Sequence, residues 1–275
     1  MTAQERGTEA GDRDHIDFRG GTFLGPVTGK EEHHHYGPAP TATAGLPPAP
    51  AVFTGREAYV SQVLDALDPH VGRTPDTAPI LAVGGLGGMG KTALALHTAH
   101  ASSPRFPGGT LFIDMRGYDE IPTAPEQAVL TLLRSLGIRN SELPSEADEL
   151  YTWYRHQLAT REPVLIVLDN VSDPGQVAPL LPSDARHRVL VTSRESLDSL
   201  PVLQINLGPM RPDEAVALLD RSLRLKHPGD SRMTAEPAAA QQLVELCGCM
   251  PLALQIAAAQ LRRHAWVRAR PDCYG

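Results

Sequence analysis

The sequence predicts an α/β fold in which helices cover both faces of a parallel five-stranded sheet, followed by a small all-helical region. Five apolar runs of strand length recur along the chain, and segments with helical periodicity separate most of them. Strands that alternate with helices form a parallel sheet, because each connecting helix packs back onto it. Beyond Pro212 only helical patterns remain. The expected strands cover residues 80–83, 110–114, 164–169, 188–192 and 202–206.

Apolar spacing, together with start and stop signals, predicts the helices. Thr123 and Glu126 have the spacing of a capping box, and Gly137 ends the helix that they open. The apolar face of that helix carries Val129, Leu132, Leu133 and Leu136. A second helix, over about residues 145–160, has an apolar side made of Ala147, Leu150, Tyr154 and Leu158. The all-helical region is expected to hold helices over about residues 212–224, 236–247 and 252–263.

Changes in composition suggest the domain boundaries. Residues 1–50 mix charges with Gly, Thr and Pro, so they are expected to be a disordered segment that ends in a Pro-rich linker. Within them, residues 14–38 contain β-prone pairs that could template onto identical segments, although an unstructured tail is the alternative. The expected parts that follow are a nucleotide-binding core at 51–208, a helical subdomain at 209–265 and a tail at 266–275.

Composition and charge limit the classes of partner. The net charge of −7 argues against a surface that wraps nucleic acid, which needs a basic stripe, so no direct nucleic-acid contact is expected. No stretch approaches the roughly 18 apolar residues of a membrane span, and the first residues lack the apolar core of a signal peptide. Cys247, Cys249 and Cys273 are too few for a disulfide framework, and we interpret the first two as small core residues. A cytoplasmic protein without membrane contact is therefore expected.

One segment predicts a phosphate-binding loop and so a P-loop NTPase fold. Residues 85–92 fit the pattern Gly-x-x-x-x-Gly-Lys-[Ser/Thr], after an apolar strand and before a helical run. Glycines let backbone N–H groups converge on an anion, and Lys91 reaches the outer phosphates. The hydroxyl of Thr92 is a candidate Mg²⁺ ligand. The expected phosphate-binding residues are Gly85, Gly87, Gly88, Met89, Gly90, Lys91, Thr92 and Ala93.

Three residues at strand ends complete the candidate site and join Lys91 as candidate catalytic residues. Asp169 ends an apolar strand in the Walker B manner and is expected to hold Mg²⁺ across from Thr92. Asn170 stands where many hydrolysing relatives have a second carboxylate; its amide can orient a water but cannot accept the proton. At most a slow ATPase is therefore expected. Arg194 ends the next strand, either as a γ-phosphate sensor or as a merely exposed arginine.

Six segments occur in an order that resembles the NB-ARC domain of STAND-class signal-transduction ATPases, particularly the actinobacterial regulator and TPR-repeat types. They are residues 52–57, 84–92, 112–117, 165–170, 192–194 and 250–254, and the resemblance covers about residues 51–265. It implies that Phe53 and Arg56 line the adenine side and that Pro251 packs against the base or sugar. It also implies a cytoplasmic regulator that ADP holds in a closed, off state and that ATP opens for self-association.

Two departures from the family pattern bear on these expectations. Cys249 stands where the family usually has Gly, which puts the local backbone geometry in question. The chain ends at Gly275, before the family's winged-helix and repeat regions, so it looks like a short version that should hold nucleotide more weakly. Three interpretations stay open: an ATP/ADP signalling switch, an active P-loop ATPase or kinase, and a truncated fragment that binds nucleotide without switching. No Arg-rich lid follows Asp169, which favours the switch.

Overall fold

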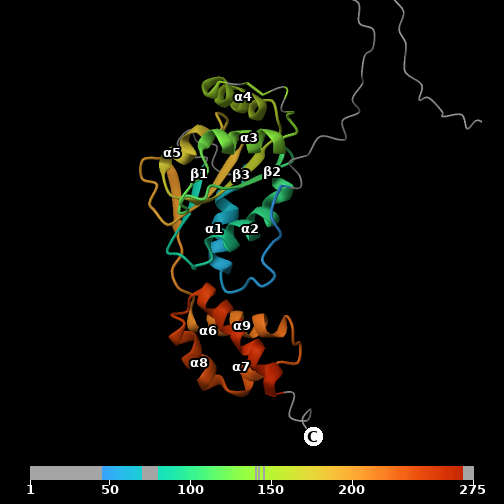
Figure 1. Cartoon of the computed structure of the whole chain (residues 1–275), viewed down its shortest axis with the longest axis vertical. Helices are drawn as coiled ribbons and strands as arrows, with labels where there is room; N and C mark the ends of the chain where they lie inside the picture. The colour runs from blue at the N-terminus through green and yellow to red at the C-terminus, as the bar shows by residue number, and fades with distance from the viewer. Residues whose placement is uncertain (1–44, 70–79, 140, 142, 145, 269–275) are drawn as a thin grey trace, which may run out of the picture. The chain divides into compact units, whose positions relative to one another are not determined.

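The computed structural model describes residues 45–69, 80–139, 141, 143, 144 and 146–268 (Figure 1). The expectations for the N-terminal segment up to residue 44, including pairing through residues 14–38, lie outside these residues. So do the expectations for Cys273 and for the end of the tail. The backbone of residues 264–268 is described, but their side chains are not.

Five parallel strands form one sheet, as predicted, and their order, which the sequence analysis did not address, is β2-β3-β4-β1-β5 (Figure 1). Their bounds are β1 Ile80–Gly84, β2 Gly109–Asp114, β3 Val164–Val171, β4 Arg188–Ser193 and β5 Val202–Asn206. Strand β4 lies between β1 and β3. The carboxyl ends of these three strands therefore meet at one edge of the sheet, which is where ligands bind in open α/β folds.

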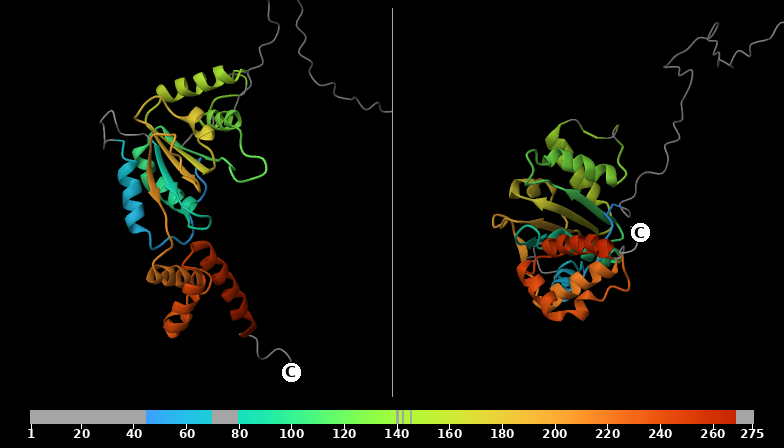
Figure 2. Two further views of the ribbon diagram at one scale, coloured as in Figure 1. Left: turned by 90° about the vertical axis from the view of Figure 1, so that its left-hand side faces the viewer. Right: turned by 60° about the horizontal axis from the view of Figure 1, so that its bottom comes forward.

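Helices cover both faces of the sheet (Figure 2). Successive strand residues point to opposite faces, so Ile80 and Ala82 join one apolar cluster while Leu81 and Val83 join the other. Helices α1 (Glu57–Ala66) and α2 (Lys91–Ser102) pack on the second cluster. Helices α3, α4 and α5 contribute to the first; their bounds are Pro125–Ser135, Ala147–Ala159 and Pro174–Val177. Two 3₁₀ helices cover Ser103–Arg105 and Ala178–Leu180.

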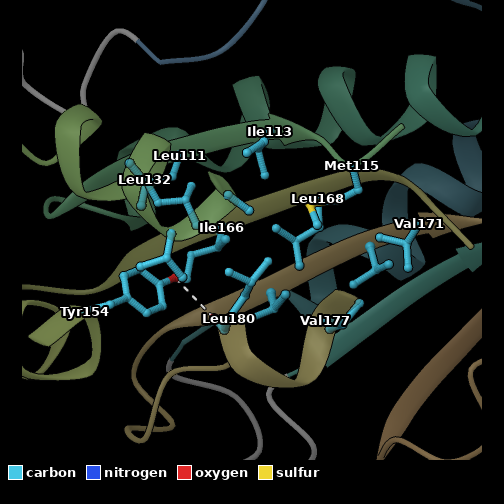
Figure 3. Close-up of a cluster of buried hydrophobic side chains, with 14 of the residues drawn as sticks. Leu111, Ile113, Met115, Leu132, Tyr154, Ile166, Leu168, Val171, Val177 and Leu180 are labelled. Carbon is cyan, nitrogen blue, oxygen red and sulfur yellow. Dashed lines mark hydrogen bonds between the residues drawn. The ribbon is translucent and has the colours of Figure 1, made fainter. Parts of the chain in front are cut away.

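The core on the α3 side is built around Tyr154, which is fully buried among aliphatic side chains (Figure 3). Its hydroxyl donates to the carbonyl of Leu180 at 3.1 Å, so the polar end of the ring is satisfied. Burial raises the pKa of this phenol above its usual range, because a phenolate would lose its hydration. Leu150 and Leu158 are also buried, as the helical spacing predicted, but Ala147 is exposed at the first position of α4.

The predicted capping box at Thr123 and Glu126 is wrong. Helix α3 begins at Pro125, and its N-cap residue Ala124 makes no side-chain cap. Thr123 instead donates through Oγ1 to the carbonyl of Asp114 at 3.1 Å, and Glu126 accepts the hydroxyl of Tyr151 at 2.7 Å. Tertiary partners have captured both side chains, and Pro in the first turn starts the helix without them. Helices α1 and α5 were not predicted.

A separate apolar cluster holds the all-helical part together. Its helices are α6 Pro212–Arg224, α7 Arg232–Ala235, α8 Pro237–Leu246 and α9 Pro251–Arg268, of which α7 was not predicted. Helix α8 ends in a Schellman motif, with N–H groups of Gly248 and Cys249 bonded to the carbonyls of Glu245 and Val244. Cys249 is buried with a left-handed φ of 51°, a conformation that favours the glycine of the family pattern.

Within the described segments, no helix combines the length and apolarity that crossing a membrane requires.

His187, the residue before β4, is fully buried. Its Nδ1 accepts the N–H of Val164 at 3.1 Å. Burial lowers the pKa of this imidazole, because a charged ring would be desolvated. The native protein therefore keeps the ring neutral at the start of β3.

Because the unfolded chain protonates His187 at a higher pH than the native chain does, native stability should fall as the pH drops below about 6.5. This one group contributes at most about 1.4 kcal/mol per pH unit. In His187→Asn the amide oxygen can still accept the Val164 N–H but does not titrate. Urea unfolding measured from about pH 8 to about pH 5 should show that the free energy of unfolding falls less steeply with pH for this variant than for the native chain. His156→Asn, at an exposed position on α4, is the control, and equal slopes for His187→Asn and the native chain would contradict the assignment.

Candidate functional site

The phosphate loop joins the end of β1 to the start of α2, with Gly90 as the N-cap of the helix. Gly90 has a φ of 88° and Gly85 a φ of 136°, values that glycine adopts without strain. A Cβ added at Gly85 would lie 2.6 Å from the carbonyl oxygen of Leu207, so a larger residue has no room there. The loop thus presents backbone N–H groups at the positive end of a helix, as an anion site requires.

Lys91 lies inside this loop and is almost fully buried. Its ammonium donates to the carbonyl of Gly85 at 2.7 Å and to that of Leu86 at 3.0 Å. Burial lowers the pKa of Lys91, and the charge of Arg194 acts in the same direction, while Asp169 opposes both. An arriving phosphate would offer this ammonium stronger, charge-assisted acceptors than the two carbonyls.

Asp169 is the buried carboxylate of the site, with 3% of its surface exposed. Thr92 donates through Oγ1 to its two oxygens at 2.9 and 3.0 Å, and Thr192 donates to Oδ1 at 2.5 Å. Burial raises the pKa of this carboxyl, while the two hydroxyl groups act in the opposite direction. The sequence analysis did not identify Thr192, although its place at the end of a predicted strand was a usable signal.

Thr92 and Asp169 fit a Mg²⁺ ion. Hydroxyl and carboxylate oxygens are the hard ligands that Mg²⁺ prefers, and it is usually bound by one or two carboxylates together with phosphate oxygens. The hydroxyl and the carboxylate are close enough for one ion to replace the hydrogen bonds between them. The described residues include no cluster of three or more His, Cys, Asp or Glu side chains with metal-binding geometry. A Mg²⁺ site that relies on one carboxylate and a phosphate does not need such a cluster.

Asn170 occupies a bulge in β3, where the pairing with β4 shifts register, and has a left-handed φ of 56°. Its backbone N–H donates to Thr192 Oγ1 at 3.0 Å. Its side-chain Nδ2 donates to Asp114 Oδ1 at 3.2 Å and to Asp169 Oδ2 at 3.3 Å. Asp114 pairs with Asp169 across β2 and β3, so the sequence analysis missed a carboxylate at this edge. Asn170 therefore lies between two carboxylates and is oriented by both.

Arg194 follows β4 and is exposed beside the phosphate loop. A Cβ added at Gly87 would lie 3.7 Å from its Cζ, which places the guanidinium next to the loop. The same Cζ lies 4.2 Å from the centroid of the Tyr118 ring. Arg194 thus has the position that a contact with a bound phosphate chain requires.

A cavity of about 410 Å³ opens between the phosphate loop and the start of α9. Leu252 donates its backbone N–H to the carbonyl of Gly88 at 3.2 Å, which joins the two walls. Asp169 is absent from the lining because it is buried deeper. The residues that line the cavity are Pro48, Pro50, Gly87, Gly88, Gly90, Lys91, Thr92, Ala93, Leu96, Asn170, Arg194, Pro251, Leu252 and Gln255.

The residues expected on the adenine side line a narrower space of about 30 Å³, which shares Gly90, Ala93, Pro251 and Gln255 with the larger cavity. Phe53 stacks on His97 with ring centroids 4.1 Å apart and an interplanar angle of 8°. Arg56 is 6% exposed, and its Nη2 donates to the carbonyls of Gly208 at 2.8 Å and Met89 at 3.5 Å. Arg56 therefore also ties the segment after β5 to the phosphate loop.

The structure brings most of the predicted site residues together around these two spaces. Lys91, Asn170 and Arg194 line the larger one, and Met89 and the two adenine-side residues line the narrower one. Gly85 lines neither, and its contribution is the carbonyl that Lys91 contacts. Sequence reasoning missed Asp114, Tyr118 and Thr192.

No protein-family model matches the chain. The chain is 39% identical over 237 residues to the regulatory protein AfsR of Streptomyces coelicolor, covering 83% of this chain and 23% of that protein. It is 38% identical over 225 residues to AfsR of Streptomyces griseus, covering 81% and 22%. A probable disease resistance protein of Arabidopsis thaliana is 24% identical over 238 residues, covering 82% and 26%. The chain therefore spans about a quarter of the length of these curated relatives.

Solved structures of low identity share the fold. The Aeropyrum pernix ORC1 protein in complex with DNA matches with a TM-score of 0.53 at 20% identity, covering 78% of this chain and 62% of that one. The Walker-type ATPase paby2304 of Pyrococcus abyssi matches with a TM-score of 0.53 at 14% identity, covering 82% and 72%. At these identities the likenesses show the fold alone. The chain belongs to the NB-ARC domains of the STAND class of P-loop ATPases.

Proposed function

We propose that this domain binds ATP and ADP together with Mg²⁺ and acts as a nucleotide-dependent signalling switch. In this proposal ADP holds the off state, ATP favours the on state, and hydrolysis is slow or absent. One observation carries the proposal. Lys91 and Thr92 of the phosphate loop lie opposite Asp169, and Thr92 is within hydrogen-bond distance of its carboxylate. The cavity beside them has a volume of about 410 Å³ and is lined by residues from Arg194 to Pro251, so it has room for more than a lone phosphate.

The chain's own residues account for phosphate binding. The backbone N–H groups of the loop and the dipole of α2 face the phosphate chain, and the Lys91 ammonium transfers from two carbonyls to phosphate oxygens. Thr92 and Asp169 would hold the ion, and bound Mg²⁺ neutralises charge on the outer phosphates. Arg194 supplies a planar fork of donors for the terminal phosphate. A contact made to ATP and not to ADP is what a switch requires.

The adenine preference rests on the side chains around the narrower space, which at about 30 Å³ would have to widen to admit a base. Its lining includes Phe53, Val52, Met89 and Pro251, which are apolar side chains suited to a purine ring. The Phe53 ring already stacks on a planar partner, His97, and a base could extend or replace that stack. Arg56 keeps its bonds to Gly208 and Met89 and would act by holding the wall in place.

Slow hydrolysis follows from Asn170. The two side-chain contacts use its amide nitrogen as the donor, so its oxygen remains to orient a water but cannot take the proton. The alternative, an active ATPase, is favoured by one observation, the carboxylate of Asp114 on the neighbouring strand. The Asn170 side chain lies between Asp114 and Asp169, which argues for the slower enzyme.

The regulatory role is proposed from relatives, because AfsR is named a regulatory protein and this chain matches only a part of it. We propose that this chain is a cytoplasmic regulator that acts through self-association, with adenine nucleotide as its ligand. The net charge of −7 supports a role without direct nucleic-acid contact for the chain itself.

Saturating ATP or ADP with Mg²⁺ should raise the melting temperature of the protein more than GTP does. ATP or ADP with Mg²⁺ at about 100 times its dissociation constant should add about 2.7 kcal/mol of stability, or several degrees. GTP should give a smaller shift, and Lys91→Ala should abolish the shift with either adenine nucleotide. Lys226→Ala, at an exposed lysine away from the loop, is the matched control. A native protein that melts at the same temperature with and without ATP or ADP refutes the proposal, and a guanine preference refutes its adenine part.

Asn170→Asp should accelerate ATP hydrolysis by at least about tenfold, because it adds a proton acceptor and general bases contribute roughly 10²–10⁴-fold. Both Asn and Asp tolerate the left-handed backbone at this position. Single-turnover hydrolysis with purified protein measures the effect, and Asn206→Asp at the end of β5 is the control. Rapid turnover by the native chain, or no change in Asn170→Asp, would count against the role given to Asn170.

A further inference from the structure

Tyr118 lies in the loop between β2 and α3 and bridges the ends of β3 and β4. Its hydroxyl donates to the carbonyl of Val171 at 3.0 Å and accepts the backbone N–H of Arg194 at 2.6 Å. The hydroxyl of Ser193 lies 3.4 Å from the same oxygen. A phenol has one proton to donate, and the Val171 carbonyl can only accept it. The hydroxyl therefore joins the strand that carries Asp169 to the first residue beyond β4.

The ring of Tyr118 holds the side chain of the same arginine. The guanidinium carbon of Arg194 lies 4.2 Å from the ring centroid, well within the range of a cation–π contact. Among the described residues, none accepts a hydrogen bond from this guanidinium. Its donors are therefore available to an anion, while the contact with the ring restricts where the guanidinium can lie.

The loop that carries Tyr118 is itself fastened to the end of β3. Met115 donates its N–H to the carbonyl of Asp169 at 2.8 Å, and Gly117 donates to that of Asn170 at 2.7 Å. A Cβ added at Gly117 would lie 2.4 Å from the backbone nitrogen of Ser172, so the two segments approach as closely as glycine allows. The position of the Tyr118 ring is therefore set by the same strand end that positions Asp169.

On the opposite side, the guanidinium lies next to the phosphate loop. A Cβ added at Gly87 would be 3.7 Å from Arg194 Cζ, and both residues line the larger cavity. The guanidinium is thus placed between an aromatic ring that orients it and the loop where phosphates would bind. A terminal phosphate of ATP would meet donors that are already ordered, whereas the shorter phosphate chain of ADP depends on them less.

We propose that Tyr118 is the positioning residue of Arg194 and that its ring sets the preference of the domain for ATP over ADP. This inference rests on the proposed function, because it assumes that Arg194 contacts the terminal phosphate. Tyr118 lines neither of the two spaces, so in this inference it acts only through Arg194.

Calorimetric titration of the full chain with Mg²⁺ and either ADP or a non-hydrolysable ATP analogue tests the inference. Tyr118→Leu removes ring and hydroxyl and should weaken binding of the analogue by about tenfold, with ADP changed by about twofold or less. Tyr118→Phe keeps the ring and should retain most of the preference for the analogue. Tyr151→Phe, which removes a tyrosine hydroxyl bond between α4 and Glu126 on α3, is the control and should change neither affinity.

The same titrations in an Arg194→Ala background separate the inference from the proposed function. In the Arg194→Ala background, Tyr118→Leu should not weaken binding of the analogue any further, because the side chain that Tyr118 positions is absent. If Arg194→Ala weakens the analogue but Tyr118→Leu does not, or if the leucine variant weakens both nucleotides equally, this inference is overturned alone. If Arg194→Ala leaves analogue binding unchanged, the sensor role in the proposed function fails. Should Tyr118→Leu not fold, a preference in Tyr118→Phe as weak as in Arg194→Ala would overturn the role of the ring.

Discussion

The interaction on which the site depends is the pair of hydroxyl bonds to the buried carboxylate of Asp169. A carboxylate taken out of water is costly unless donors surround it, and here Thr92 and Thr192 provide them. The two threonines come from α2 and β4, so the carboxylate at the end of β3 joins that helix to the neighbouring strand. Thr192 also accepts the N–H of Asn170, so one hydroxyl fixes both residues at the end of β3.

In the proposed function, the side chains around this centre would hold nucleotide more than turn it over rapidly. Lys91 is kept inside the loop by two carbonyls, ready for stronger acceptors. Asn170, held between two carboxylates, offers an oxygen that can orient water without taking its proton. The guanidinium of Arg194 contacts the ring of Tyr118, and none of the described residues accepts a hydrogen bond from it. Binding contacts that differ between ATP and ADP are the physical requirement for a switch.

Local patterns predicted the parts of the fold that local chemistry decides. Apolar runs gave correct strands, and the Gly-rich segment appears as the loop between β1 and α2 because its glycines and flanks suffice. The capping box failed because Asp114 and Tyr151, distant in sequence, captured its two side chains. Thr192 and Tyr118 were missed for the same reason: their partners depend on β4 lying between β1 and β3. The Schellman motif at the end of α8 accounts for the left-handed Gly248, and the next residue, Cys249, is also left-handed although it is not glycine.

When nucleotide binds, the Thr92 hydroxyl should exchange its hydrogen bond to Asp169 for a metal ion, and calorimetry with and without Mg²⁺ tests this. For the native chain, Mg²⁺ should tighten binding of a non-hydrolysable ATP analogue by at least about tenfold relative to EDTA. Thr92→Val keeps the shape of the side chain and should lose that gain while retaining the affinity measured in EDTA. No heat with the analogue in either condition, or an undiminished Mg²⁺ effect in Thr92→Val, would contradict the account.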